Sequence, residues 1–470
     1  MQQGFSDRND EFNEANVEAS VQRFEEMIKN QTKSFFDEET YEILADYYVS
    51  KGEMEMAMKA CLLGLESYPY SLELLLDKAQ LHINQQQFEE ALDLLDKAST
   101  FNPSDPEIKY MRGVAYNLVG DYDLALEQFK EALLLSDEKD TIYFQIGQTF
   151  QNRHKYEEAI ICYKKAIKIN PSNEFSYFEL IFCLDQIDQL EDSIVYFQAL
   201  VDESPYSHYA WFCLGTAYSR LEKFVDAANA YDYAVTIKED FASAWFNLGH
   251  TYMNLEHFKD AKNCYQNTLK YEEPSAEVNT YLGATCEKLE EYEEAFKYYK
   301  VATTLDDSWD EAWFGLGSVL YEQERWYEAV HFVKKAIELN DFHSDYWLLL
   351  GDTEAKIGNV QSSVDAYSQA SFYDPSNPDV WLNWSLLHYE DDDYKAALDV
   401  ILEGIDELPT EADLYYRATV YAIFDGKYSE AYHYIEIALS LNYAAHEQIY
   451  EFFPNLETQK ALFRIIEQYK

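Results

Sequence analysis

The sequence predicts an all-α protein, an α–α superhelix of about twelve stacked helix–turn–helix units with a capping helical segment at each end. Three observations lead to this prediction. A small residue returns every 34 residues, and the apolar residues within each period follow the spacing of two amphipathic helices. Glycine (15) and proline (10) are also scarce among the 470 residues, which favours helices over a sandwich or a barrel.

The period of 34 residues is set by a column of small residues. Ten members of the column are Ala57, Ala91, Ala125, Ala159, Ala227, Ala261, Ala295, Ala329, Ala397 and Ala431. Ser193 and Ser363 take the two remaining places. Residues 38–445 therefore form twelve units without insertion or deletion, and such a period indicates stacked helical repeats.

Three further columns keep the same phase. Glycine stands twelve residues before the small column, at Gly113, Gly147, Gly215, Gly249, Gly283, Gly317 and Gly351. Tryptophan stands four residues before glycine, at Trp211, Trp245, Trp313, Trp347 and Trp381. Proline stands twelve residues after the small column, at Pro69, Pro103, Pro171, Pro205, Pro375 and Pro409. Small residues let two helix axes cross closely, and proline suits a turn where no helix has to continue.

The unit that begins at His208 reads HYAWFCLGTAYSRLEKFVDAANAYDYAV. It resembles the tetratricopeptide repeat, whose signature is W-x2-L-G-x2-Y followed by A-x3-F. The resemblance extends over residues 38–445. It implies helix pairs stacked into a right-handed superhelix.

The N-terminal end of such a stack needs a cover, because each unit buries its apolar face only against its neighbours. We expect residues 1–15 to be an acidic, flexible N-terminus. Residues 16–37 are expected to form an N-terminal capping helix and a loop, with Ser20, Phe24 and Met27 on the apolar stripe of that helix.

At the other end, residues 446–470 are expected to form C-terminal capping helices, the first of them interrupted by Pro454. The apolar stripe of the last helix consists of Leu462, Ile465, Ile466 and Tyr469. Docking of a partner protein on this last helix is the alternative to capping.

The resemblance also implies a concave groove, lined by one stripe of the first helix of each unit. At the fifth position of that helix, the third to seventh units all carry an aromatic ring. Rings interleaved with amides suit an extended peptide or a helix of a partner protein. The predicted binding residues are Tyr110, Phe144, Gln148, Phe178, Phe182, Phe212, Thr216, Phe246, Asn247, His250 and Phe314. The alternative is that these rings are family consensus without a ligand.

Charge narrows the class of ligand. The chain has 87 Asp and Glu against 36 Lys and Arg, a formal net charge of −51, which disfavours nucleic acid and anionic membrane surfaces. The expected inner wall is acidic toward both ends, at Glu39, Asp46, Glu73, Glu107, Glu277, Glu311, Asp345, Asp352, Asp379 and Asp413. We therefore expect a basic ligand with an apolar middle, unless the acidity serves solubility alone.

Catalytic chemistry is not expected. The sequence contains no glycine-rich phosphate loop, GxSxG elbow or HExxH pair. The cysteines are isolated, at Cys61, Cys162, Cys183, Cys213, Cys264 and Cys286, so neither a metal site nor a cofactor is predicted. No stretch approaches the about 20 apolar residues of a membrane helix, and the N-terminus does not resemble a signal peptide, so a cytoplasmic location is expected.

The sequence thus predicts a non-catalytic scaffold or adaptor that holds a peptide segment or helix of a partner protein in its groove. The alternative is a regulatory or assembly subunit that contacts its partner through its outer face or its terminal helices. The oligomeric state stays open.

Overall fold

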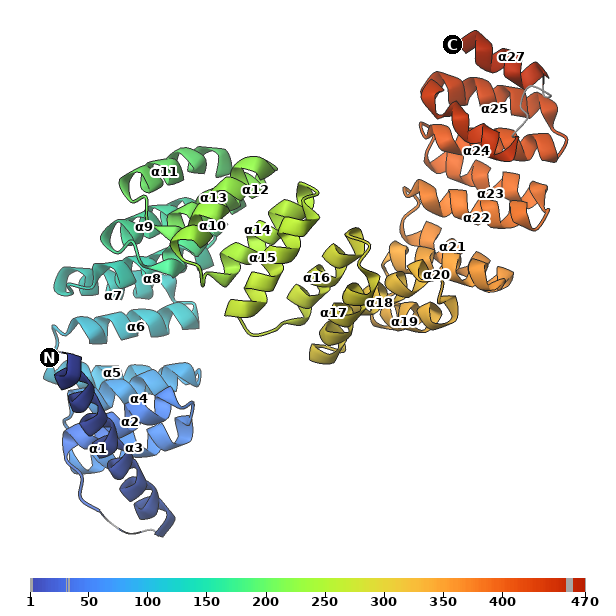
Figure 1. The fold of residues 1–470 in the computed structure, drawn as a ribbon. Coiled ribbons are helices and arrows are strands. Elements are labelled where there is room, and N and C mark those ends of the chain that lie inside the picture. Colours follow the sequence, from blue (N-terminus) through green and yellow to red (C-terminus); the bar gives the residue numbers. More distant parts are fainter. Residues whose placement is uncertain (1–2, 31, 33, 454–459, 470) are drawn as a thin grey trace. The chain divides into compact units, whose positions relative to one another are not determined.

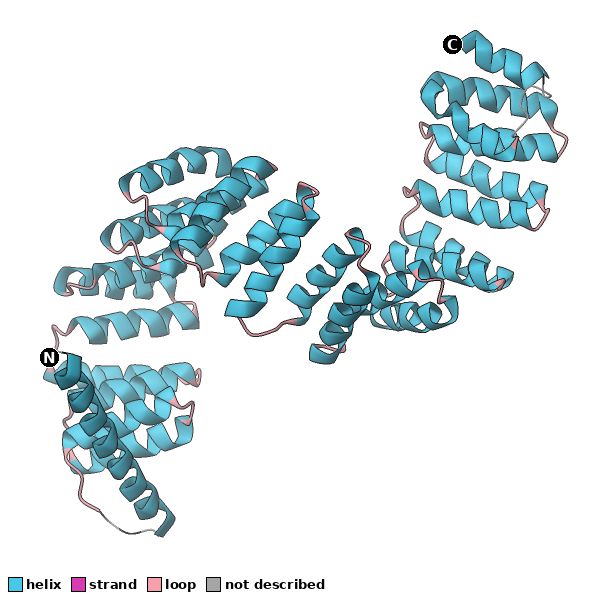
Figure 2. Ribbon diagram, viewed as in Figure 1, coloured by secondary structure: helices cyan, strands magenta, loops and turns pink. Residues whose placement is uncertain are grey.

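The computed structural model describes residues 3–30, 32, 34–453 and 460–469. These residues form 27 α-helices and one 3-10 helix, and no strand (Figures 1 and 2). The predicted all-α class is confirmed. Within the described ranges, no helix is long and apolar enough to cross a lipid bilayer.

Twenty-four of these helices form the twelve predicted pairs. The first helices of the pairs are α2 (Glu38–Ser50), α4 (Leu72–Asn84), α6 (Pro106–Val119), α8 (Lys139–Asn152), α10 (Glu174–Gln186), α12 (His208–Arg220), α14 (Ala242–Asn254), α16 (Ala276–Lys288), α18 (Asp310–Glu322), α20 (Ser344–Ile357), α22 (Pro378–Glu390) and α24 (Ala412–Phe424). The second helices are α3 (Met54–Ser67), α5 (Phe88–Phe101), α7 (Tyr122–Leu135), α9 (Tyr156–Ile169), α11 (Leu190–Glu203), α13 (Phe224–Ile237), α15 (Phe258–Tyr271), α17 (Tyr292–Leu305), α19 (Trp326–Leu339), α21 (Val360–Tyr373), α23 (Tyr394–Glu407) and α25 (Tyr428–Leu441).

The helices gather into two compact units, Met1–Ile237 and Lys238–Lys470. The boundary falls between the sixth and seventh pairs, so each unit contains six complete repeats. It also divides the predicted aromatic positions, with Phe212 in the first unit and Phe246 in the second.

The small columns lie where the two helices of a repeat cross. Every alanine of the small column is fully buried. A Cβ atom built on Gly147 would lie 2.5 Å from the Tyr163 ring, and one on Gly215 would lie 2.7 Å from the Tyr231 ring. Glycine is therefore required because the ring of the second helix fills the space above it.

The tryptophan column holds the turn between repeats. The indole N–H of Trp211 donates to the Pro205 carbonyl at 2.9 Å, and the indole of Trp347 donates to the Asp341 carbonyl at 2.8 Å. Trp245, Trp313 and Trp381 make the same bond to the carbonyl six residues earlier. These bonds satisfy a loop carbonyl that the stacked helices partly remove from water.

The turn between the two helices of each repeat places one residue in the left-handed region. The glycines at this place are Gly52, Gly120, Gly358 and Gly426. The other residues are Gln86, His154, Asp188, Glu222, Glu256, Glu290, Glu324 and Asp392, with φ between 52° and 62°. Side chains with a Cβ are strained in this region, so eight repeats carry a local cost that glycine would remove.

This strain gives a prediction for Glu256, whose φ is 59°. Glu256→Gly should unfold at higher temperature than Glu256→Ala, by about 1 kcal/mol of unfolding free energy, because only glycine is free of the left-handed penalty. Both variants lose the same carboxylate, so the difference between their unfolding free energies reports the backbone strain at residue 256. Thermal denaturation followed by circular dichroism measures it, and equal stability of the two variants would contradict the prediction.

The N-terminal helix α1 (Gln3–Asn30) covers the first repeat. Val21, Phe24 and Met27 are buried against α2 and α3, and the Phe24 ring lies 6.0 Å from the Tyr48 ring. The helix begins at Gln3 rather than near residue 16, where the prediction placed it. Its first half has too few apolar residues to show a periodic stripe in the sequence.

The C-terminal segment covers the last repeat. It consists of the 3-10 helix η1 (Tyr443–Gln448), α26 (Ile449–Phe452) and α27 (Lys460–Tyr469). Leu462 and Ile466 are each 2% exposed and belong to the hydrophobic cluster of α24 and α25, while Ile465 packs at its edge and Tyr469 is exposed. Pro454 lies outside the described residues.

Candidate functional site

Most first helices contact the first helix of the next repeat in the same unit. Direct contacts join α2 to α4, α4 to α6, α6 to α8 and α10 to α12 in the first unit. In the second unit they join α16, α18, α20, α22 and α24 in succession. We call the surface of these first helices the inner wall, and it carries the stripe of predicted binding residues.

In the first unit, the predicted rings differ in exposure. Tyr110, Phe144 and Phe178 are half-buried, so part of each ring faces solvent. Phe212 is only 5% exposed, with its ring centroid 5.4 Å from that of Phe178 and 5.6 Å from that of Tyr231. Phe212 is therefore part of the packing beneath the wall, which residue spacing alone could not show.

The most exposed rings of this wall lie on α10. Phe182 is 44% exposed, and Phe175, which was not among the predicted residues, is 67% exposed. The Phe175 centroid lies 6.2 Å from that of Phe144. A signal was present in the sequence, because Phe175 stands at a position where most units carry an acid. We define the aromatic wall as Tyr110, Phe144, Phe175, Phe178 and Phe182.

Several predicted polar residues already have partners within the chain. The Tyr231 hydroxyl donates to Thr216 at 3.1 Å, and the Tyr265 hydroxyl lies 3.1 Å from Nδ1 of His250. Burial lowers the pKa of His250 to about 4, so its ring is neutral at physiological pH. Thr216 and His250 thus satisfy the buried tyrosines that stand over the glycine column.

The two predicted amides are placed differently. The Asn247 side chain donates to the Ser243 carbonyl at 3.0 Å, on its own helix. Gln148 is half-buried on α8, and its side chain has no hydrogen-bond partner among the described residues. Gln148 is the amide that is open to a ligand on the inner wall.

In the second unit, a cavity of about 580 Å³ opens beside Phe314. It is lined by α16, α17 and α18, and its main side chains are Tyr281, Glu287, Tyr299, Glu311, Phe314 and Glu322, with Lys288 also at its lining. We call it the aromatic–acidic pocket. Phe246 lies on α14 with its ring 5.8 Å from Tyr281, so it supports the same aromatic cluster.

Two carboxylates line this pocket, Glu287, which is half-buried, and Glu311, which is more exposed. Glu287 accepts hydrogen bonds from the Tyr299 hydroxyl at 2.8 Å and from the Ser318 hydroxyl. Burial raises the pKa of Glu287, and burial together with the neighbouring carboxylate of Asp310 raises that of Glu311. A bound cation would stabilise the charged form of such partly desolvated carboxylates, because it replaces the hydration that they have lost.

The N-terminal repeats carry an acidic cluster on the inner wall. Burial raises the pKa of Asp77 to about 7, with further contributions from the carboxylates of Asp46, Glu73, Glu42 and Glu107. Three of these neighbours, on α2, α4 and α6, had been predicted to line the wall. Asp77 itself was not predicted, because it lies beside the expected stripe.

Asp77 should make stability depend on pH. Its pKa is raised above the unfolded value of about 3.9, so the folded state holds a proton that the unfolded state loses, and stability falls as pH rises from about 4 to about 7. Asp77→Asn should remove this dependence and stabilise the protein by about 1–2 kcal/mol at pH 8, after allowance for partial solvent exposure.

Urea denaturation at pH 5 and pH 8 measures this effect. The matched control is Asp93→Asn, an exposed acid on the second helix α5, which should keep the wild-type pH dependence. An Asp77→Asn protein that loses as much stability as the wild type between the two pH values would refute the assignment.

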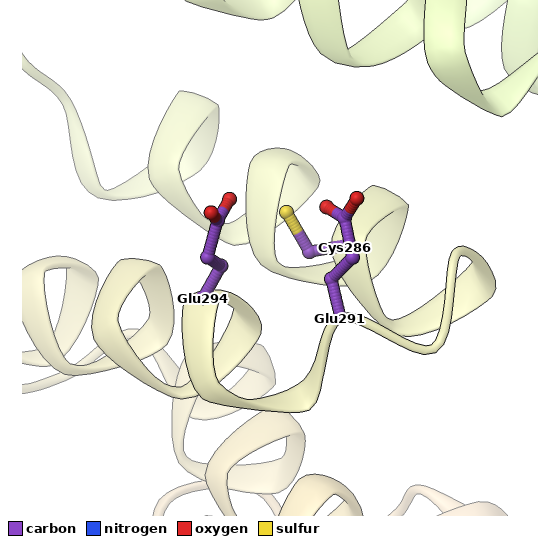
Figure 3. Close-up of side chains that lie close together, drawn as sticks. All are labelled: Cys286, Glu291 and Glu294. Atoms are coloured by element: carbon purple, nitrogen blue, oxygen red, sulfur yellow. The ribbon is translucent and has the colours of Figure 1, made fainter.

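One cluster of side chains could in principle hold a metal ion. Cys286, Glu291 and Glu294 lie close together on α16, α17 and the turn between them (Figure 3). The ammonium of Lys262 on α15 binds both carboxylates, with Nζ 2.6 Å from Glu294. Burial lowers the pKa of Lys262, but the bonds to Glu291 and Glu294 more than offset this and raise it. Lys262 therefore occupies the position of a cation, and the cluster carries no metal assignment.

Comparison with models of protein families identifies the repeat. Models of the tetratricopeptide repeat match residues 76–141, 141–173, 246–310, 311–335 and 348–412. Together these segments cover more than half of the 470 residues. The chain belongs to the tetratricopeptide-repeat family. This confirms the predicted resemblance and supports a protein–protein interaction scaffold.

One solved structure similar to this tetratricopeptide-repeat protein is YrrB, described as "a TPR protein with an unusual peptide-binding site". It matches at 22% identity and TM-score 0.34, covering 39% of this chain and 95% of that one. A chain of the APC/C hetero-tetramer Cut9-Hcn1 structure matches at 17% identity and TM-score 0.43, covering 87% of this chain and 95% of that one. MamA matches at 20% identity and TM-score 0.33, covering 34% and 94%. Comparison with curated protein sequences found no match.

Proposed function

We propose that this protein is a non-catalytic scaffold that binds a peptide segment or helix of a partner protein on its inner wall. The observation that carries the proposal is the aromatic–acidic pocket, in which Tyr281, Tyr299 and Phe314 meet Glu287 and Glu311 around one cavity. Aromatic faces attract cations, and carboxylates pair with them. The pocket thus suits a lysine or arginine side chain whose stem packs against the rings.

The aromatic wall of the first unit offers a second, separate surface for a ligand. Phe175 and Phe182 are exposed rings on α10. The Phe175 ring lies 6.2 Å from that of Phe144, and the Phe182 ring lies 6.4 Å from that of Tyr156. Exposed rings on a rigid support lose little conformational entropy on binding. The aromatic wall therefore suits apolar side chains and the pocket suits basic ones, the latter in agreement with the net charge of −51.

Two labelled peptides test this proposal. One is a fluorescein-labelled peptide of about fifteen residues in which lysines alternate with leucine and phenylalanine, and the other has glutamate in place of every lysine. Fluorescence polarisation with the full chain should show tighter binding of the basic peptide. Glu287→Gln with Glu311→Gln should weaken that binding at least about tenfold, because glutamine keeps the hydrogen-bond acceptor but removes the charge.

Phe175→Ala with Phe182→Ala tests the first unit separately and should weaken binding of the peptide's leucine and phenylalanine side chains there, because both rings are exposed and their loss spares the core. The matched controls are Glu272→Gln with Glu273→Gln, exposed acids in the loop before α16, and Phe101→Ala, a 49% exposed ring on α5. Unchanged binding in both groove variants would contradict the proposal and favour a partner on the outer face or the terminal helices.

A further inference from the structure

The fifth repeat departs from the other repeats at its helix crossing. At the eighth position of the first helix, the other repeats carry Gly, Ala, Ser or Thr, whereas the fifth carries Ile181. Its two helices, α10 and α11, contact each other far less than the helices of any other pair. An isoleucine where glycine elsewhere admits a ring acts as a wedge, so α11 stands away from α10.

The separation leaves a cavity of about 470 Å³ between α9 and α11. Its apolar lining comes from Ile161, Ile167, Tyr177, Tyr196 and Leu200. Ile161 is 54% exposed at the mouth, whereas Ile167 and Tyr177 are buried at the floor. The cavity is therefore open to solvent and apolar inside, and it is formed mainly by second helices rather than by the inner wall.

Three lysines of α9 line the same cavity, in a chain whose net charge is −51. They are Lys164, Lys165 and Lys168, and none has an ion-pair partner among the residues that the structure describes. Lys164 Nζ instead lies 4.3 Å above the Tyr196 ring, and Lys165 Nζ lies 5.1 Å from the Tyr143 ring. Glu203 also lines the cavity, without pairing with a lysine.

We propose that this lysine-lined cavity binds an acidic peptide segment of a partner protein, which inserts an aliphatic or aromatic side chain against Ile161 and Leu200. Charge complementarity selects the segment, because unpaired lysines beside an apolar opening favour carboxylates flanking an apolar anchor. The chemistry is opposite to that of the inner wall, so one chain would hold a basic segment on one surface and an acidic segment on another.

A phosphate group, which concentrates its charge at one point, fits the cavity less well than the carboxylates of an acidic peptide. The lysines lie toward the C-terminal end of α9, where the helix dipole is negative, and Glu203 adds a carboxylate to the lining. Arginine, which binds phosphate in a bidentate manner, is absent from the lining. Carboxylates spread along a peptide meet the three lysines without placing a dianion at one point.

The test uses the glutamate-containing peptide described above, labelled with fluorescein, and the full chain. Lys165→Glu with Lys168→Glu changes two exposed side chains and should weaken its binding at least about tenfold. Lys97→Glu with Lys130→Glu is the matched control, since it makes the same charge change at exposed sites of α5 and α7 and should leave binding within about twofold. Ile161→Ser should weaken binding without a change of charge.

Three results would overturn the proposal. They are absence of binding by the acidic peptide, equal weakening by the control pair, and binding of inositol phosphates or phosphatidylserine vesicles in place of the peptide. The inner-wall variants Glu287→Gln with Glu311→Gln should leave the acidic peptide's affinity unchanged. Failure of this proposal is therefore distinguishable from failure of the inner-wall proposal.

Discussion

Gly215→Val is expected to destabilise the first unit by about 3 kcal/mol. A Cβ atom at this position would lie 2.7 Å from Cδ1 of the fully packed Tyr231, which is 1% exposed. The ring cannot withdraw, because it is buried and packs against the Phe212 ring, whose centroid lies 5.6 Å away. The two helices of the sixth repeat must therefore separate, as they do in the fifth.

The measurement is urea denaturation, with hydrogen exchange to locate the loss in α12 and α13, since repeat arrays can open locally. Ile181→Val is the matched control. It places valine at the same repeat position as Gly215→Val, but in the fifth repeat, where the wild-type residue is already branched. It should cost only about 1 kcal/mol. Tyr231→Ala combined with Gly215→Val should cost less than the sum of the two single changes. A loss below about 1 kcal/mol for Gly215→Val would refute the steric account.

The second large effect is expected at the C-terminal end. Leu462→Ala with Ile466→Ala removes the two side chains of α27 that are 2% exposed and pack on α25. We expect the last repeat to lose about 3 kcal/mol of protection, since truncation of a buried leucine or isoleucine costs about 2–5 kcal/mol. Amide hydrogen exchange in α24 and α25 would report this as exchange about a hundredfold faster.

Tyr469→Ala is the matched control on the same helix, and because the ring is 44% exposed it should cost less than about 0.5 kcal/mol. The first unit should be unaffected, because repeats transmit stability only to their neighbours. If the double change leaves exchange in α25 at its wild-type rate, α27 does not act as a cap, and docking of a partner becomes the better explanation of its apolar stripe.

The binding surfaces were less accessible to sequence reasoning than the fold. Spacing put Tyr110, Phe144, Phe178 and Phe212 on one stripe, but it could not tell that the first three are half-buried while Phe212 is buried. Thr216 and His250 were expected to face a ligand, whereas they bond to tyrosines of the second helix. Such pairings join residues about half a repeat apart, and their geometry depends on how two helices cross.

The sequence by itself determined the helix class, the period of 34 residues and the family, because each column repeats one local requirement: a small residue at a crossing or a proline in a turn. Tertiary structure alone decided which rings are exposed, which acids cluster and where a cavity opens. These properties come from contacts between helices, and a single exception such as Ile181 alters them while every helix keeps its place in the sequence pattern.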